Sequence, residues 1–173
     1  MNRVVITGMG VIAPNAHGTN DYEQALRMGR SGIRFIEKLA QHQFGCQVAG
    51  VPQNVDELKQ KCFSTEDLLA MSSSMIYAGI AGIDCWNDAG LEVRTSTSNV
   101  DWDTGAIIGT GVGGVDIIGE KIIPLVNQNK VRRLGSTIIE QVMCSSVSAK
   151  LGGLLGLGGQ VTTNSSACTT GTE

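Results

Sequence analysis

The sequence predicts an α/β layered fold with a largely parallel sheet. Apolar and β-branched runs over residues 4–7, 105–109 and 160–167 predict three strands, and helical patterns lie between them. Alternation of strand and helix is typical of parallel sheets, in which helices connect successive strands. Glycine-rich turns follow the first two strands, at residues 8–10 and 109–114. Such turns let a neighbouring backbone or a ligand approach closely.

After the first turn, the pattern predicts one helix and a less regular segment. A helix over residues 19–28 is expected, because Thr19 or Asn20 can cap its N-terminus. Residues 33–53 are expected to be irregular with short strands, of which residues 46–51 form the clearest.

A helix nearly free of charge is predicted over residues 68–86. Ser64 followed by Asp67 matches a capping pattern just before this apolar run, and Gly90 supplies a stop. Because small residues fill most remaining positions, we expect the helix to be packed closely on more than one side.

The rest of the chain is expected to complete the alternation. A polar loop over residues 94–103 precedes the second strand, which is predicted to be buried. Helices are predicted over residues 115–127, despite Pro124, and 136–155, before the third strand. A further helix is expected to begin near Cys168.

Composition and charge exclude several functions. The 13 basic and 16 acidic residues give a net charge of −3, which offers no electrostatic footprint for nucleic acid. No apolar run is long enough for a signal peptide or a membrane span. The odd number of cysteines, with no CxxC pair, favours a reducing cytoplasm and suggests no metal site.

The distribution of charge indicates that the chain is part of a larger body. From residue 134 onward, the charged residues are Glu140, Lys150 and Glu173. A segment so poor in charge should be buried on most sides. Since it extends to the last residue, we expect another polypeptide segment to cover it.

The first glycine turn matches the G-x-G-x-x-[GA] pattern of dinucleotide sites, with Glu37 as a possible ribose ligand. That pattern works only if a helix begins within the glycines, and residues 14–18 interrupt it. Close backbone packing is therefore favoured. The second turn has no Lys-Ser/Thr pair and is not a P-loop, so ligand approach and helix packing both stay open.

Cys168 has the context of a nucleophile, whereas the other four cysteines are expected to be apolar filler. It follows a buried strand and is expected in the first turn of a helix, where unpaired amides favour a thiolate and can help bind an oxyanion. A cysteine nucleophile normally needs a partner such as histidine. Neither His17 nor His42 has a catalytic context, so the catalytic set looks incomplete.

Five motifs in order resemble the elongating β-ketoacyl-[acyl carrier protein] synthases. They are Arg3–Pro14, Gly29–Ile33, Asp88–Leu91, Ile108–Gly114 and Ser165–Gly171. The resemblance implies a thiolase-like five-layered α/β/α/β/α fold built from two similar halves, in a homodimer or heterodimer. Residues 1–173 would be the N-terminal half, ending inside the nucleophile helix, with the C-terminal half as a separate or cleaved chain.

The resemblance also implies a reaction. Cys168 would accept an acyl group from a carrier-protein phosphopantetheine thioester, and its amide would form half of an oxyanion hole. Malonyl-carrier protein would then be decarboxylated and condensed with the acyl group, in fatty-acid or polyketide and polyene synthesis. Apart from the phosphopantetheine of the carrier protein, no cofactor is implied.

Further residues are assigned by the same resemblance. Gly111, Val112 and Thr169 would bind the acyl substrate, with the size of Val112 helping to set chain length. Met143 would lie near a dimer interface.

For acyl carrier protein docking, this chain has Ser64–Asp67 where the family often has basic residues. Lys130, Arg132 and Arg133 are the alternative docking residues.

Two other functions stay open. The chain could belong to a non-catalytic partner similar to chain-length factors, although these typically lack the nucleophile that Cys168 would provide. It could also belong to a thiolase that acts on coenzyme A thioesters.

Overall fold

The computed structural model describes residues 3–93 and 100–172, in two compact units. Unit 1 comprises Met1–Leu58 and Ile80–Leu91, and unit 2 comprises Lys59–Gly79 and Glu92–Glu173. Two helices, α3 (Val55–Cys62) and α5 (Ser73–Asp88), contribute residues to both units. The predicted polar loop over residues 94–103 lies largely outside the described residues.

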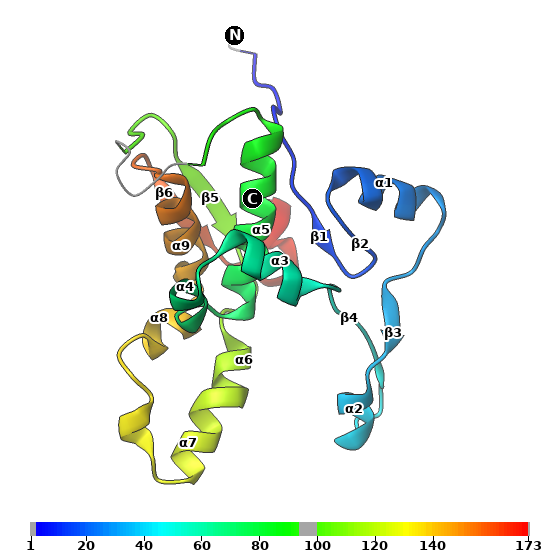
Figure 1. The fold of residues 1–173 in the computed structure, drawn as a ribbon, viewed down its shortest axis with the longest axis vertical. Coiled ribbons are helices and arrows are strands. Elements are labelled where there is room, and N and C mark those ends of the chain that lie inside the picture. The colour runs from blue at the N-terminus through cyan, green and yellow to red at the C-terminus, as the bar shows by residue number, and fades with distance from the viewer. Residues whose placement is uncertain (1–2, 94–99, 173) are drawn as a thin grey trace. The chain divides into compact units, whose positions relative to one another are not determined.

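Unit 1 is built from short helices and two small antiparallel pairs of strands (Figure 1). Its elements are β1 (Ile12–Ala13), β2 (Ala16–His17), α1 (Thr19–Arg27), β3 (Ile33–Phe35), α2 (Glu37–Gln41) and β4 (Val48–Gly50). The predicted helix over residues 19–28 is confirmed by α1, although its N-cap is Gly18 and no side chain caps it. The short strand expected within residues 46–51 is confirmed by β4, whereas α2 was not predicted.

The prediction of a buried strand over residues 4–7 is wrong. These residues form no strand, and the side chains of Val4 and Ile6 are 92% and 84% exposed. A strand needs a neighbour to satisfy its backbone N–H and C=O groups. Among the described residues, no strand pairs with this segment. Its apolar composition alone is therefore not enough to form a strand.

Unit 2 contains the parallel pair that the alternation of elements predicts. Ala106 of β5 pairs with Val161 of β6, and the register continues to Gly109 and Asn164 (Figure 1). The elements of unit 2 besides α3 and α5 are α4 (Thr65–Leu69), β5 (Ala106–Gly109), α6 (Val115–Ile117), the π-helix η1 (Ile118–Ile122), α7 (Ile123–Asn127), η2 (Val131–Arg133), α8 (Ile138–Val142), α9 (Ser145–Leu155), β6 (Val161–Asn164) and η3 (Ala167–Thr172).

Two helices that the pattern predicts as continuous are interrupted. The run over residues 68–86 is divided at residues 70–72 into α4 and α5, because Asp116 caps a new helix there by accepting a hydrogen bond from the amide of Ser73, at 2.9 Å. The run over residues 136–155 is divided at Met143, whose backbone is extended. Apolar periodicity does not reveal the first of these breaks, because the residue that caps the new helix lies far away in the sequence.

The helix predicted over residues 115–127 is confirmed as a continuous helical segment, α6, η1 and α7. Its π-helical part ends just before Ile123 and Pro124. Since proline has no N–H to donate and its ring crowds the preceding turn, a wider turn is a common way to accommodate it.

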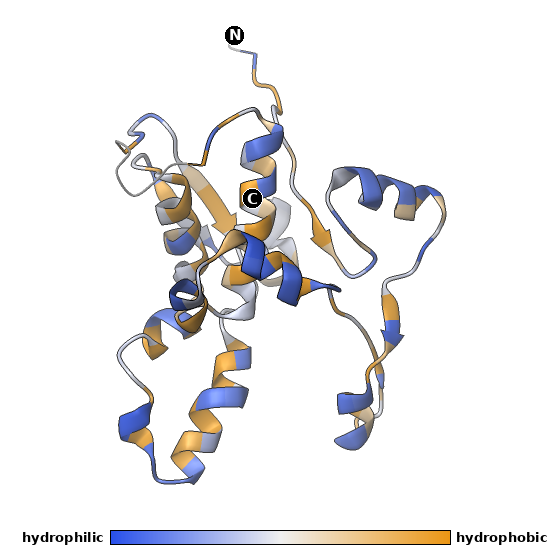
Figure 2. Cartoon of the chain, in the orientation of Figure 1, coloured by the Kyte–Doolittle hydropathy of each residue, from blue (hydrophilic) through white to orange (hydrophobic). Residues whose placement is uncertain are grey.

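Buried apolar side chains are concentrated in unit 2. They are Phe63, Met71, Met75, Ile138, Val147 and Leu155, while Ala25 and Ile80 are buried in unit 1. Figure 2 shows apolar residues along β5 and α9. The expectation that the strand at residues 105–109 is buried is not met, since one face of β5 is half-buried and the other is exposed, with Ile107 74% exposed. Among the described helices, none has the length and apolar character to cross a membrane.

Candidate active site

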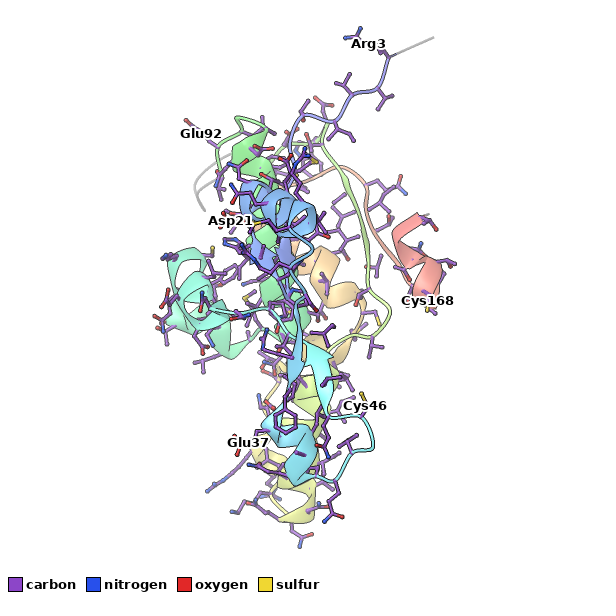
Figure 3. The ribbon with its side chains drawn as sticks, turned by 90° about the vertical axis from the view of Figure 1, so that its right-hand side faces the viewer. Arg3, Asp21, Glu37, Cys46, Glu92 and Cys168 are labelled. Carbon is purple, nitrogen blue, oxygen red and sulfur yellow. The ribbon has the colours of Figure 1, made fainter. Side chains whose placement is uncertain are left out.

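Cys168 lies on a sharp turn after β6. Ala167, just before it, adopts a left-handed backbone conformation, with a φ of 52°, and the short helix η3 begins there. Positive φ is uncommon for residues other than glycine, and such strained positions cluster at functional sites. The side chain of Cys168 is exposed, as Figure 3 shows on the outside of η3. The turn therefore presents a thiol to solvent at the end of a strand.

The second glycine turn lies beside this thiol-bearing turn. Because β5 and β6 are parallel, their carboxyl ends lie at the same edge. The amide of Thr110 donates a 3.2 Å hydrogen bond to the carbonyl of Asn164, which extends the pairing past β5. A Cβ placed on Gly111 would meet only the carbonyl oxygen of Ala167, at 3.8 Å. The structure thus brings Gly111 and the Cys168 turn together.

The two other predicted acyl-binding residues are exposed. Val112 is 63% exposed, and Thr169 is exposed on η3, where its hydroxyl donates to the carbonyl of Ser166 at 2.8 Å. Thr169 therefore shares the turn with Cys168, and Val112 shares the loop with Gly111. Their contact with an acyl chain stays a prediction.

The far side of the glycine loop is packed against α8. A Cβ on Gly113 or Gly114 would overlap a carbonyl oxygen of α8, that of Val142 or Gln141 respectively. The Gln141 side chain is buried, and its Nε2 donates to the carbonyl of Leu69 at 2.9 Å. Met143 follows directly and is 51% exposed. The loop is thus packed against α8 at Gly113 and Gly114, while Gly111 faces the turn that carries Cys168.

The three candidate docking residues are exposed in the turn that follows α7. Lys130 precedes η2, and Arg132 and Arg133 lie within it. The ammonium of Lys130 donates to the side-chain oxygen of Gln128 at 2.8 Å. In Figure 1, this turn (yellow) lies at the end of α7 that is remote from η3 (red). The cations are available to a partner, but they do not border Cys168.

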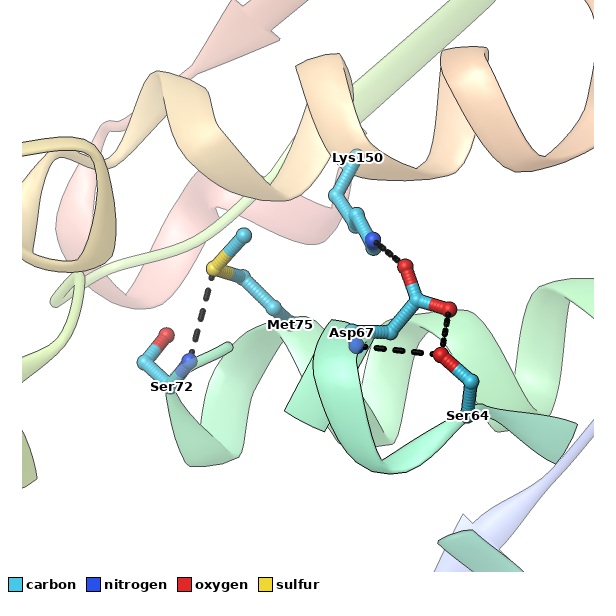
Figure 4. Close-up of polar contacts among 5 residues, drawn as sticks. All are labelled: Ser64, Asp67, Ser72, Met75 and Lys150. Atoms are coloured by element: carbon cyan, nitrogen blue, oxygen red, sulfur yellow. Dashed lines mark hydrogen bonds and ion pairs between the residues drawn. The ribbon is translucent and has the colours of Figure 1, made fainter. Parts of the chain in front are cut away.

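The acidic segment that replaces the family's basic residues has a structural role (Figure 4). Ser64 caps α4 by accepting a 3.1 Å hydrogen bond from the amide of Asp67, as the capping pattern predicts. The carboxylate of Asp67 also accepts a 2.7 Å hydrogen bond from Lys150 of α9. The hydrogen bonds from Lys150 and then Ser64 lower the pKa of Asp67. Asp67 therefore joins α4 to the helix that leads into β6.

The remaining candidates lie in unit 1, away from the Cys168 turn in sequence. Nε2 of His17 is 2.7 Å from the Asp84 carboxylate, and His42 follows the last residue of α2. Gly8 and Gly10 lie against α5, where a Cβ on Gly10 would overlap the carbonyl oxygen of Ala81. Since α1 begins only at Thr19, this arrangement is the close packing that the sequence favours over a dinucleotide site.

The model of the "Beta-ketoacyl synthase, N-terminal domain" family matches residues 1–173. The chain belongs to the β-ketoacyl synthase family. Its fold is similar to that of the ishigamide ketosynthase/chain length factor, with a TM-score of 0.77 and 24% sequence identity. That match covers 93% of this chain and 39% of the other chain. A type II polyketide ketosynthase in complex with its acyl-carrier protein has a TM-score of 0.73 and 17% identity, over 99% of this chain and 44% of the other chain. The predicted α/β fold of thiolase-like ketosynthases is thereby confirmed.

A curated relative agrees with this assignment. The ketosynthase chain is 31% identical over 169 residues to 3-oxoacyl-[acyl-carrier-protein] synthase 2 of Vibrio harveyi. The match covers 98% of this chain and 39% of the relative. The chain therefore spans about two fifths of the length of the relative that it matches.

One residue at the turn was not singled out from the ketosynthase sequence. Thr170 lies two positions after Cys168, and its hydroxyl oxygen contacts backbone groups on both sides of the Ser166–Ala167 peptide. The sequence signal is a hydroxyl residue three positions after Ala167, a spacing at which Ser and Thr often bond the backbone. That spacing is too common to indicate a site without the turn geometry.

Proposed function

We propose that the protein containing this chain is a 3-oxoacyl-[acyl-carrier-protein] synthase, an acyltransferase of fatty-acid or polyketide and polyene synthesis. The observation that carries the proposal is the exposed thiol of Cys168 on a strained strand-to-helix turn, beside the open glycine Gly111 in the loop that follows the parallel strand β5. The names of the relatives support the same activity.

The reaction begins at the sulfur of Cys168. The thiolate attacks the carbonyl carbon of an acyl thioester, a C–S bond forms, and the bond to the phosphopantetheine sulfur breaks. The departing thiol takes up the proton that Cys168 released. The amide of Cys168 is proposed to stabilise the oxyanion formed in this step.

Condensation follows on the same cysteine. A malonyl thioester loses carbon dioxide, and the electron pair of the broken C–C bond attacks the acyl-Cys168 carbonyl. Cys168 leaves as a thiolate, and the product is a β-ketoacyl thioester two carbons longer. Neither of these two reaction steps needs a metal or a redox cofactor. The acyl groups are carried on the phosphopantetheine of acyl carrier protein.

The proposal also assigns the surrounding residues. Gly111, Val112 and Thr169 line the acyl site. Lys130, Arg132 and Arg133 contact the acidic carrier protein, and Met143 lies near a dimer interface.

The rest of the proposed assembly extends beyond this chain. A second, C-terminal half supplies the catalytic histidines, as the length of the relative supports, in a homodimer or heterodimer. Because the thiols of Cys46, Cys85, Cys144 and Cys168 are free, we place the protein in the reducing cytoplasm.

The test is acyl transfer to the protein in the form in which it occurs in the cell. After incubation with acyl-carrier protein, peptide mass mapping is expected to find the acyl group on Cys168. Cys168→Ala abolishes labelling, whereas the matched control Cys46→Ala, at another exposed thiol, leaves it unchanged. Equal labelling of Cys168→Ala contradicts the proposal. Acylation by coenzyme A thioesters alone identifies a thiolase, and absence of acylation on Cys168 favours a chain-length-factor-like subunit.

A further inference from the structure

The turn that carries Cys168 needs contacts to hold it. Ala167 occupies the left-handed region, with a φ of 52°, which an L-residue adopts readily only when its surroundings impose it. The turn lies at the end of β6, so the ladder of the sheet no longer supports it. Within the part of the chain that the structure describes, hydrogen bonds inside residues 165–172 and packing against β5 hold this geometry.

A single hydroxyl group provides the central hydrogen bonds. Oγ1 of Thr170 accepts a 2.9 Å hydrogen bond from the amide of Ser166 and donates a 2.7 Å hydrogen bond to the carbonyl of Ala167. The amide of Ser166 comes before the N–Cα bond of Ala167 and the carbonyl of Ala167 comes after it, so the two hydrogen bonds together restrict the φ angle of Ala167. The Thr170 hydroxyl thus clamps the strained residue that immediately precedes Cys168.

The methyl group of the same side chain is placed against the sheet. A Cβ added to Gly109, the last residue of β5, would overlap Cγ2 of Thr170 and lie 3.1 Å from its carbonyl oxygen. Because Gly109 has no side chain, the methyl group of Thr170 can pack at this position. One side chain connects the edge of β5 to the turn after β6.

A matched residue separates this role from ordinary stabilisation of η3. The hydroxyl of Thr172 also donates to a carbonyl three residues earlier, that of Thr169, at 2.8 Å. It contacts neither Ser166 nor Ala167 in the hydrogen bonds of the turn. Removing the Thr172 hydroxyl thus weakens η3 without releasing the turn.

We propose that Thr170 is a positioning residue for Cys168, whose hydroxyl holds the left-handed turn and whose methyl group docks that turn on Gly109. The proposal rests on the role of Cys168 as the acyl-accepting nucleophile. Thr170 itself takes no part in bond formation. Its effect is to fix where the Cys168 sulfur and amide lie relative to the incoming carbonyl.

The test compares Thr170→Val, which keeps the shape and loses the hydroxyl, with Thr170→Ser and Thr172→Val in the protein as it occurs in the cell. The rate of alkylation of Cys168 by iodoacetamide, followed between about pH 6 and pH 9, and the kcat and KM of acyl transfer are measured. Thr170→Val is expected to lower the alkylation rate and kcat about tenfold with little change in KM. Thr170→Ser keeps the hydroxyl and loses only the docking methyl group, so its loss is expected to be smaller, and Thr172→Val should stay within about twofold of the wild type. Equal rates for Thr170→Val and the wild type overturn the proposal, as does an equal loss in Thr172→Val.

A second pair of variants decides the matter if Thr170→Val does not fold. Gly109→Ala is expected to displace Thr170 and slow alkylation of Cys168, and the double variant Gly109→Ala/Thr170→Ser, which removes the overlapping methyl group, is expected to recover most of the rate. Failure of the double variant to recover overturns the proposal. Alkylation needs no acyl donor, so a wild-type protein that alkylates but never transfers acyl groups refutes the proposed function and leaves the test of Thr170 intact.

Discussion

In the first glycine-rich turn, Gly8 and Gly10 both lie against the backbone of α5, and the Met9 amide between them donates to Asp88 at 2.9 Å. In the second turn, Gly113 and Gly114 lie against α8 in the same way, but Gly111 has nearly open space around it. The two turns have similar composition and follow similar apolar runs. They differ at Gly111, because no neighbouring element packs closely against it. Gly111 is also the glycine that faces the turn of Cys168.

The largest effects are expected where glycine packing is tightest. Gly10→Ala would place a Cβ against the backbone carbonyl of Ala81, and Gly114→Ala would place one against that of Gln141. Because both clashes are with backbone atoms, movement of a flexible side chain cannot relieve them. Each substitution is expected to lower the free energy of unfolding by about 3 kcal/mol, measured by urea denaturation. A loss confined to one of the two would break the likeness between the turns. Gly119→Ala, with no atom within 4 Å of the added Cβ, is the control.

A smaller effect is expected from the hydrogen bond that anchors the first turn. Asp88→Ala removes the acceptor of the Met9 amide, and this exposed contact should contribute about 1 kcal/mol. The same urea denaturation measures it, with the exposed Glu66, changed in Glu66→Ala, as the control outside the turn. An unchanged stability in Asp88→Ala would contradict this prediction and make the two turns more alike than the structure indicates.

The pH dependence of unit 2 supplies the third comparison. Lys150 and Ser64 lower the pKa of Asp67 below its ordinary value of 3.8, so the contact stabilises the fold above that value and is lost as the pH falls through the lowered pKa. Since Asp67 is 41% exposed, we expect Lys150→Met to cost only about 0.5 kcal/mol at neutral pH. Denaturation at acidic pH should show that difference vanish.

The matched control for this prediction is Lys121→Met. Its ammonium donates to the neutral side chain of Gln141 at 3.2 Å, so its effect on stability should not follow the titration of Asp67. If Lys121→Met and Lys150→Met lose their effects over the same acidic range, the assignment to Asp67 is wrong.

The smallest change in stability is expected at Gly111. The nearest atom to an added Cβ is 3.8 Å away, so Gly111→Ala should change the free energy of unfolding by less than about 0.5 kcal/mol. Because this position faces the turn of Cys168, the added methyl group should nevertheless reduce transfer of long acyl chains more than short ones. Denaturation and a chain-length series of acyl donors measure the two effects. A large loss of stability would show that Gly111 is packed like Gly10.

Sequence reasoning succeeded where local signals were self-contained. The Ser64 cap, the helix after Gly18 and the glycine stop at residue 90 depend on neighbouring residues, and the structure has each of them in place. The alternation of elements also predicted that β5 and β6 are parallel. That relation was enough to bring the glycine loop to Cys168.

The failures have a common physical cause, which is that they depend on contacts far apart in sequence. Residues 4–7 have the composition of a strand but no partner among the described strands. The break before α5 depends on Asp116, 43 positions later, capping Ser73. The seat of Thr170 on Gly109 likewise joins distant segments. Periodicity and composition carry no information about such pairs.

The pairing of β5 with β6 has a consequence for how the chain is made. Ala106 must wait for Val161, 55 positions later, before its ladder can form. At ribosomal rates of roughly 5–20 residues per second, the strand spends about 3–11 s without its partner. During that interval, the exposed backbone edge and Ile107 are open to other nascent chains. The geometry that places a glycine beside the thiol thus leaves this segment without its partner strand for part of synthesis.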